Sequence, residues 1–292
     1  MTTTPVPSTP GSLDGLGVLV TGGGSGIGLA VAERLAADGA VVTICGRTES
    51  RLADAVTEIA DRNPGADIAH VVADVTDESA ASAAVAAASE RSEGRAGGRL
   101  GAVVASAGGS ESIGPVTQLD VDAWQRTLQL NLTGTMLALK HGAATMVRGG
   151  GGSFVAISSF AAATSHPWFG AYGPSKAGID QLCRQAADEL GPSGVRVNSV
   201  RPGLVRTDLV EFITAGGPVL DSYLDNTPLG RIGEADDVAS LVRFLVGPES
   251  SWITGQAIDI DGGQSLRRGP DLSSAIEPLF GAEGLRGVVD PV

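Results

Sequence analysis

Short apolar runs alternate with longer segments of helical spacing along most of the chain, and this alternation constrains the fold more than any other feature. The runs are almost continuous in Val, Ile, Leu and Ala, as is typical of strands buried on both faces. The expected strands are 17–21, 40–45, 68–73, 100–105, 153–157, 195–200 and 257–260, and the expected helices are 27–38, 49–62, 76–93, 121–147, 171–190 and 234–246. This order predicts an α/β fold whose parallel sheet is covered by helices on both faces.

The 292 residues show no linker that would divide them, which favours a single domain. The first twelve residues, MTTTPVPSTPGS, have neither a basic nor an apolar segment and are expected to form a disordered arm. A segment interrupted by Pro and Gly follows residue 263. The expected organisation is therefore an arm at 1–12, one domain at 13–263 with a substrate loop at 208–224, and a C-terminal extension at 264–292.

The overall composition excludes several classes of protein. A formal net charge of −13 at pH 7 disfavours binding to nucleic acid and to anionic membranes. The uncharged stretch 149–175 is too rich in Gly, Ser and Thr for a membrane span, so a cytoplasmic protein is expected. Cys45 and Cys183 are expected to be small buried hydrophobes, and the three scattered histidines predict no metal site.

A glycine-rich turn joins the first expected strand to the first expected helix. The sequence Thr21-Gly-Gly-Gly-Ser-Gly-Ile-Gly28 lets the backbone turn sharply and lets an anion approach the start of the helix. Any turn from strand to helix can use glycine, but glycines in this order favour a nucleotide site. No Gly-Lys-Ser/Thr follows, which disfavours phosphoryl transfer.

The end of the second strand bears on the choice of cofactor. An acid at this point selects NAD, whereas an arginine accommodates the 2′-phosphate of NADP. This chain has Arg47 there, so NADP(H) is favoured and NAD(H) remains possible. The alternative is a solvated arginine paired with Glu49. After the third strand, Asp74 is expected to accept from the adenine amino group, to cap the following helix, or both.

Ser159, Tyr172 and Lys176 form the strongest candidate for chemistry. Tyr172 and Lys176 are four residues apart at the start of an expected helix, so they share a face, provided that Pro174 lies in the first turn. An ammonium beside a phenol lowers the phenol pKa and makes it a proton donor or acceptor for a carbonyl/alcohol pair. Ser159 follows the fifth strand, where it is placed to hydrogen-bond the substrate oxygen.

The chain resembles the short-chain dehydrogenase/reductase family over residues 13–263. The matching motifs are TGGGSGIG at 21–28, DV at 74–75, SAG at 106–108, NLTG at 131–134, ISS at 157–159, YGPSK at 172–176 and RPGLVRT at 201–207. The resemblance implies a doubly wound, Rossmann-type sheet of seven parallel strands and hydride transfer to or from NAD(P). It also implies a catalytic tetrad of Asn131, Ser159, Tyr172 and Lys176, with the helix locally distorted at Asn131 so that a water reaches the lysine.

The resemblance further implies the cofactor-binding residues. Val205 and Thr207 resemble the positions that hold the carboxamide, and Pro202 and Gly203 those that line the ring. Ser106 replaces the usual asparagine, which is expected to loosen the sheet without changing the chemistry. The implied set is Gly22, Ser25, Gly26, Ile27, Gly28, Arg47, Asp74, Val75, Ser106, Ala107, Gly108, Tyr172, Lys176, Pro202, Gly203, Val205 and Thr207.

Substrate specificity is expected from 160–170, 208–224 and the C-terminal extension. Aromatic and apolar residues in these segments indicate an apolar pocket, a lid or a subunit interface. His166 is expected either to touch substrate or to face solvent. The extension is expected to close over the site or to reach a neighbouring subunit.

The expected activity is oxidoreduction of a secondary alcohol/ketone pair, with a small-molecule substrate and no metal. Substrate candidates are a 3-oxoacyl thioester and a steroid, sugar or terpenoid alcohol. The alternative is a catalytically silent NAD(P)-binding sensor or scaffold, which the filled tetrad disfavours. The helix 121–147 and the helix of Tyr172 resemble the family's dimer-forming pair, so a homotetramer or homodimer is expected.

Overall fold

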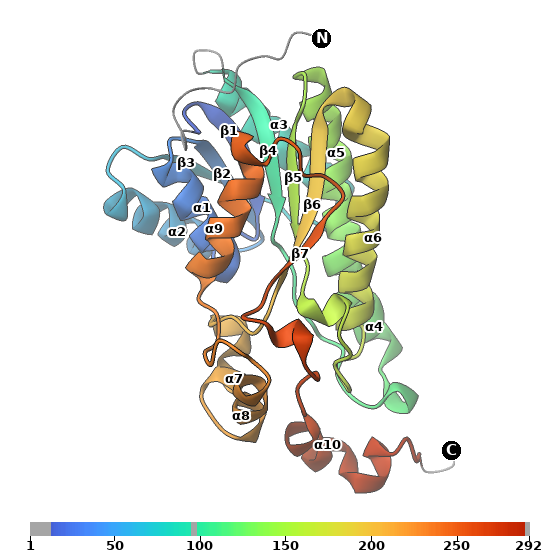
Figure 1. Ribbon diagram of the computed structural model, residues 1–292. Helices are drawn as coiled ribbons and strands as arrows, with labels where there is room; N and C mark the ends of the chain where they lie inside the picture. The colour runs from blue at the N-terminus through green and yellow to red at the C-terminus, as the bar shows by residue number, and fades with distance from the viewer. Residues whose placement is uncertain (1–12, 95–97, 290–292) are drawn as a thin grey trace.

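A single seven-stranded parallel sheet forms the centre of the protein, in the order β3-β2-β1-β4-β5-β6-β7. The computed structural model describes residues 13–94 and 98–289 (Figure 1); the expected disordered arm at 1–12 lies outside them. The strands are β1 Leu16–Thr21, β2 Val41–Gly46, β3 Asp67–Val72, β4 Arg99–Ala105, β5 Gly152–Ile157, β6 Val195–Pro202 and β7 Ala257–Ile260. All seven expected strands are confirmed, and the strand order reverses between β1 and β4.

Helices cover both faces of the sheet (Figure 1). Neighbouring residues of β1 show why: Val18 and Val20 belong to one apolar core, whereas Leu19 belongs to the other. The first core holds residues of α1 (Gly26–Ala37), α2 (Glu49–Arg62) and α9 (Ala235–Val246). The second core holds residues of α3 (Glu78–Glu93), α5 (Gly134–Arg148) and α6 (Tyr172–Leu190). The doubly wound α/β fold is therefore confirmed.

Two expected helix boundaries are wrong. The segment 121–147 is not one helix: α4 (Val121–Leu128) is followed by a π-helical turn at Gln129–Thr133 and then by α5. Helix α3 begins after Asp77, whose side chain accepts from Ala80 N at 2.7 Å. Asp77 therefore caps this helix, and Asp74, which was expected to do so, instead accepts from the N–H and hydroxyl of Thr76.

Three further helices lie beyond the carboxyl ends of the strands, where no helix was expected (Figure 1). They are α7 (Glu211–Thr214), α8 (Pro218–Asp225) and α10 (Ser273–Leu285), which is kinked at Gly281. A third apolar core joins α7 and α8 to the domain through Phe160, Leu204, Ile213, Tyr223 and Ile232. These helices are short or interrupted by Gly and Pro, and the sequence interpretation did not separate them from the surrounding loops.

The C-terminal extension packs against its own chain at this end of the molecule. Asp271 N donates to Ser222 Oγ of α8 at 2.9 Å, and Gln118 Nε2 donates to Val288 O at 3.4 Å. Leu272 and Ile276 are buried. The extension therefore lies beside the segments that carry substrate specificity in the sequence interpretation.

The two cysteines are free thiols inside the cores, as expected, and burial raises the pKa of each to about 12. Within residues 13–94 and 98–289, no helix combines the length and the apolar character needed to cross a bilayer.

Candidate active site

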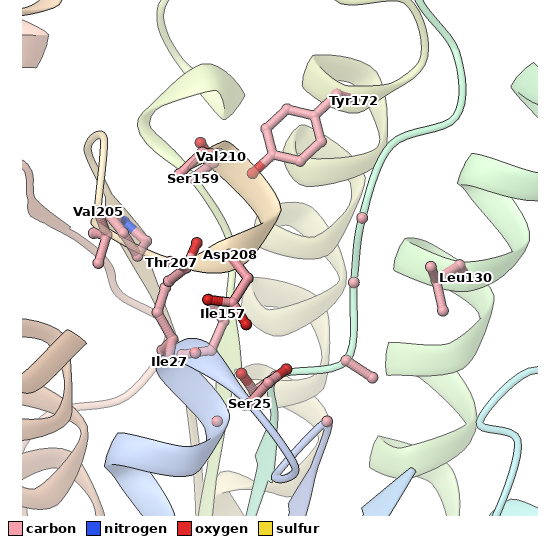
Figure 2. Close-up of a pocket in the computed structure, with 18 of the residues that line it drawn as sticks. Ser25, Ile27, Leu130, Ile157, Ser159, Tyr172, Val205, Thr207, Asp208 and Val210 are labelled. Carbon is pink, nitrogen blue, oxygen red and sulfur yellow. The ribbon is translucent and has the colours of Figure 1, made fainter. Parts of the chain in front are cut away.

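A cleft of about 620 Å³ opens at the carboxyl ends of the strands, beside the point where their order reverses. Open parallel sheets bind ligands at this point, because the loops that leave neighbouring strands diverge there to opposite faces. The glycine turn lines one end of the cleft and the first turn of α6 the other (Figure 2).

The glycine turn forms a cradle that side chains would fill. Gly22 has φ +68° and its missing Cβ would lie 2.8 Å from the backbone of Ala107, so only glycine fits. Thr21 Oγ1 accepts from Ser106 N and Ala107 N, both at 3.1 Å, and joins the turn to the end of β4. Ser25 makes no side-chain cap, so the first N–H groups of α1 are available to an anion. This cradle fits the pyrophosphate of a dinucleotide.

Two arginines lie at the far end of the cleft, next to the glycine turn. Arg47 follows β2 and Arg51 lies in the first turn of α2; both are exposed and both line the cleft. Within the described part of the chain neither arginine forms an ion pair, and the expected alternative of an Arg47–Glu49 pair is not found. The sequence interpretation missed Arg51, because no motif marks it and its place beside Arg47 depends on how the loop after β2 enters α2.

Tyr172 and Lys176 stand on the first turn of α6, with Pro174 in that same turn, as the sequence interpretation required. Lys176 is only 4% exposed, and its Nζ donates to Ile157 O at 2.8 Å and lies 5.6 Å from the centre of the Tyr172 ring. The Ser159 side chain lies close enough to the Tyr172 hydroxyl to lower its pKa, and its Oγ accepts from Ala161 N at 3.2 Å. Figure 2 shows the phenol oxygen of Tyr172 pointing into the cleft on the side of Ser159.

Burial dominates the acid–base properties of this pair. It raises the pKa of Tyr172, and the hydrogen bond with Ser159 partly opposes that rise. Burial also lowers the pKa of Lys176 from 10.5 to about 8, against the opposing effect of Asp180. The expectation that the ammonium lowers the pKa of Tyr172 is therefore wrong for the protein's own groups, because desolvation of the phenol is the larger effect.

Asn131 lies behind the cleft rather than in its wall. It is fully buried in the π-helical turn, which confirms the expected distortion of the helix. Its side chain exchanges two hydrogen bonds of 2.9 Å with the backbone of Gly109 and donates to Ser175 Oγ at 2.9 Å. A Cβ on Gly108 would lie 3.0 Å from Asn131 Oδ1 and 3.3 Å from Lys176 Nζ. Asn131 therefore supports the loop that faces the lysine.

Known proteins match both the sequence and this geometry. A family model described as Enoyl-(Acyl carrier protein) reductase matches residues 22–265. The cis-4-hydroxycyclohexanecarboxylate dehydrogenase of Sinomonas cyclohexanicum is 38% identical over 245 residues, 84% of this chain and 94% of that protein. A short-chain type dehydrogenase/reductase from Mycobacterium ulcerans superposes with a TM-score of 0.91 at 53% identity, covering 95% of this chain and all of the other.

This chain belongs to the short-chain dehydrogenase/reductase family. A further structural relative is a 7α-hydroxysteroid dehydrogenase complexed with NADH and 7-oxo glycochenodeoxycholic acid, with a TM-score of 0.79 at 29% identity and coverage of 86% of this chain and 95% of the other. The protein is an NAD(P)-dependent oxidoreductase that transfers a hydride between nicotinamide and a secondary alcohol or ketone. The comparisons give no support to a silent sensor or scaffold.

The short-chain dehydrogenase/reductase cleft brings together nearly all residues that the sequence interpretation selected. Asn131 is the exception, because it stands behind the wall. Those that line the cleft are Gly22, Ser25, Gly26, Ile27, Gly28, Arg47, Asp74, Val75, Ser106, Ala107, Gly108, Ser159, Tyr172, Lys176, Pro202, Gly203, Val205 and Thr207.

The substrate end of this dehydrogenase/reductase cleft has an aromatic and aliphatic wall that the sequence interpretation only outlined. The rings of Phe169 and Tyr172 meet edge to face, with their centres 5.1 Å apart. The wall residues beyond Tyr172 are Phe160, His166, Phe169, Leu204, Val210, Ile213 and Tyr223. Tyr223 comes from α8, and the sequence interpretation placed it only within the broad substrate loop 208–224.

Proposed function

We propose that Tyr172 is the general acid for carbonyl reduction and the general base for alcohol oxidation. The meeting of Ser159, Tyr172 and the buried Lys176 in the cleft that also holds the glycine cradle is the observation that carries this proposal. A bound nicotinamide cofactor supplies the hydride, and in its oxidised form it adds a positive charge near the phenol. The raised pKa of Tyr172 keeps the phenol protonated at neutral pH, which suits proton donation to a ketone oxygen.

The other members of the proposed tetrad prepare this tyrosine. Ser159 holds the substrate oxygen beside the phenol, and Lys176 places its ammonium against Tyr172 when protonated. Asn131 is a positioning residue that fixes the loop at Gly109 and the first turn of α6 through Ser175. Ser158 donates to Lys176 O at 3.1 Å and so supports the helix backbone rather than the substrate.

The neighbouring serines provide a matched test of this arrangement. With NADPH and a panel of cyclic ketones, we expect Ser159→Ala to lower kcat/KM by roughly 100-fold or more, because it removes a hydrogen bond to the reacting oxygen. We expect Ser158→Ala to retain activity within about tenfold, since Ser158 bonds only the backbone of α6. Equal losses in the two variants would contradict the assignment of Ser159.

We further propose NADP(H) as the preferred cofactor, with NAD(H) as the weaker one. Two unpaired arginines and no acid at the end of β2 support this preference, since guanidinium groups bind a 2′-phosphate. Arg47→Ala and Arg51→Ala are each expected to raise the Kd of NADPH about tenfold, roughly 1.4 kcal/mol, and to leave NADH within about twofold. Unchanged NADPH binding in both variants would reverse the assignment.

We propose a cyclic secondary alcohol/ketone as the substrate class. The aromatic wall supports a ring-shaped ligand, and the Sinomonas relative is named for a substrate with a cyclohexane ring, a hydroxycyclohexanecarboxylate. A 3-oxoacyl thioester, a sugar and a terpenoid belong in the same substrate panel as competitors. Faster turnover of an acyl thioester than of any cyclic ketone would contradict the proposal.

A cytoplasmic homotetramer or homodimer completes the proposed function. The negative charge supports the location, and cell fractionation tests it. Helices α5 and α6 pack side by side in the outer layer (Figure 1), and the side chain of Trp252, before the edge strand β7, is 99% exposed. Light scattering should give a dimeric or tetrameric mass, and a monomeric mass would contradict this part of the proposal.

A further inference from the structure

Two polar groups in the substrate wall have no role in the chemistry proposed above. They are the imidazole of His166 and the hydroxyl of Tyr223, both of which line the cleft. Their ring centres lie 6.5 Å apart, and the ring of Phe160 packs against both. They are thus neighbouring polar groups in a wall that is otherwise aromatic and aliphatic.

The hydrogen-bonding state of His166 follows from its surroundings. Nδ1 lies 3.0 Å from Thr164 O, and a carbonyl oxygen only accepts, so Nδ1 carries a proton. Burial lowers the pKa of His166 below its usual value, so the ring is neutral at pH 7. Nε2 is therefore a hydrogen-bond acceptor, and none of the described residues donates to it.

Tyr223 has the complementary character. Its side chain is 4% exposed, and burial together with the nearby Tyr172 raises its pKa, so its hydroxyl keeps its proton. Within the described ranges no side chain or backbone group bonds that hydroxyl; the only bonds of Tyr223 are at its backbone, which accepts from Thr227 Oγ1 and Gln264 Nε2. The wall thus offers one acceptor and one donor side by side.

The loop that carries His166 is held in place. Trp168 has φ +63°, a strained conformation for a bulky residue that persists only where the surroundings enforce it. Its carbonyl accepts from Gly114 N at 2.8 Å, and Gly114 pairs with Phe169 as an isolated bridge. The loop can therefore present the imidazole in a fixed position.

The charges around the cleft limit what this pair can bind. The cations among the described lining residues are Arg47 and Arg51 at the adenosine end and Lys176, which is held at Ile157 O. The acids among the described lining residues are Asp74 and Asp208, and Asp208 lies two residues before Val210 of the apolar wall. A carboxylate or phosphate at the substrate end would meet no guanidinium or free ammonium.

We propose that His166 and Tyr223 determine specificity for a neutral cyclic substrate that carries a second hydroxyl, away from the carbon that reacts. A hydroxyl can donate to His166 Nε2 and accept from the Tyr223 hydroxyl at the same time. A keto group cannot donate, a carboxylate cannot donate either, and a hydrocarbon leaves both protein groups without a partner. This inference rests on the proposed function, because it specifies the substrate of the same site.

Matched pairs of ketones test the inference. The probes are cyclohexanone with 4-hydroxycyclohexanone, and 1-decalone with 6-hydroxy-1-decalone, which place the hydroxyl at two distances from the carbonyl; 4-oxocyclohexanecarboxylate is the charged probe. We expect at least one hydroxylated ketone to exceed its parent in kcat/KM by about tenfold or more, as two hydrogen bonds allow. The carboxylate is expected to be the poorest of the cyclohexanones.

The variants assign this preference to the two side chains. His166→Phe and Tyr223→Phe keep a ring and remove one polar group each, so each should lower the ratio of hydroxylated to parent ketone several-fold, and the double variant should bring it to about one. Phe169→Leu changes the wall without removing a polar group and should lower kcat/KM for both members of a pair alike. If His166 or Tyr223 had a purely structural role, its substitution would also leave the ratio of kcat/KM for the hydroxylated ketone to that for the parent ketone unchanged.

The failures of the two proposals are distinguishable. If no ketone is reduced with either cofactor, the proposed function is wrong. If the parent ketones are reduced but neither pair shows a preference, if the preference survives the double substitution, or if the carboxylate is the best probe, the inference about His166 and Tyr223 is overturned.

Discussion

Lys176 shows how this site combines function with a cost in stability. Its side chain is buried at the start of α6 with one backbone acceptor, Ile157 O, and burial lowers its pKa to about 8. The charged form of Lys176 is less favourable in the folded protein than in the unfolded chain, where the pKa is near 10.5. The ammonium that the chemistry uses at neutral pH thus destabilises the fold.

This cost predicts a pH-dependent effect of Lys176→Met on stability. Between pH 8 and 10.5 the unfolded chain binds more protons at this lysine than the folded chain, so the stability of the unsubstituted protein rises with pH there. The methionine variant has no such gain. Its unfolding free energy relative to the unsubstituted protein, measured by denaturant titration, should therefore fall by roughly 2 kcal/mol from pH 7 to pH 10. A difference that does not change with pH would contradict the buried lysine.

Tyr172 predicts different pH dependences for the two directions of the reaction. Its raised pKa leaves the phenol protonated at neutral pH, as reduction requires, whereas oxidation requires the phenol oxygen to give up its proton. Between pH 6 and 10, kcat/KM should rise with pH for alcohol oxidation and stay level for ketone reduction, because the phenol stays protonated over this range. Parallel profiles in the two directions would argue against a shared acid–base group.

At the scale of elements, the π-helical turn Gln129–Thr133 is the feature that places Asn131. From this turn the Asn131 side chain pairs with both backbone groups of Gly109 and reaches Ser175. The extra residue in the turn shifts the register at this point, as single π-turns in functional helices do. The turn also receives a hydrogen bond of 2.6 Å from Thr135 Oγ1 to Asn131 O.

Asn131→Ala should therefore destabilise the protein by roughly 2–4 kcal/mol, because it leaves the buried N–H and C=O of Gly109 unpaired. Gln129→Ala, in the exposed part of the same turn, should stay within about 0.5 kcal/mol. Denaturant unfolding of both variants makes the comparison. Similar small losses would show that the pairing with Gly109 is dispensable.

Which elements the sequence predicts depends on how locally each is determined. The strands and the large helices follow from periodicity, and the glycine turn and Tyr172–Lys176 follow from motifs. Helices α7, α8 and α10 are short or kinked, and their place against the domain depends on tertiary burial, as Tyr223 and Ile276 show. The pKa of Tyr172 likewise depends on burial, which no spacing reveals, and for this reason the effect of the protein's own groups on it was predicted in the wrong direction.

At the scale of the whole molecule, the C-terminal extension joins the substrate wall to the domain. Gln264 accepts from Leu204 N at 3.2 Å and donates to Thr227 Oγ1 at 3.0 Å, and Asp271 bonds Ser222 on α8. The cofactor end of the cleft has none of these contacts. The separation of a domain at 13–263 from an extension at 264–292 stays a prediction, and so does a contact of the extension with a neighbouring subunit.

The extension provides a matched pair of substitutions. Ile276 is 1% exposed, so Ile276→Asp would bury a charge and loosen α10. Leu279 is 68% exposed, so the charge of Leu279→Asp would stay in solvent and leave α10 in place. We expect Ile276→Asp to raise the KM for ketones several-fold while the Kd of NADPH stays within about twofold. Leu279→Asp should change neither constant. An equal loss of cofactor binding in Ile276→Asp would show that the extension stabilises the whole domain rather than the substrate wall.

The most direct test of the account is the rate of ketone reduction by Tyr172→Phe, followed by NADPH absorbance. The account predicts a loss in kcat of roughly 100- to 10,000-fold, with NADPH binding and the unfolding transition preserved, because only the proton donor is removed. Turnover within a few-fold of the unsubstituted enzyme would contradict the assignment of the proton transfer to Tyr172.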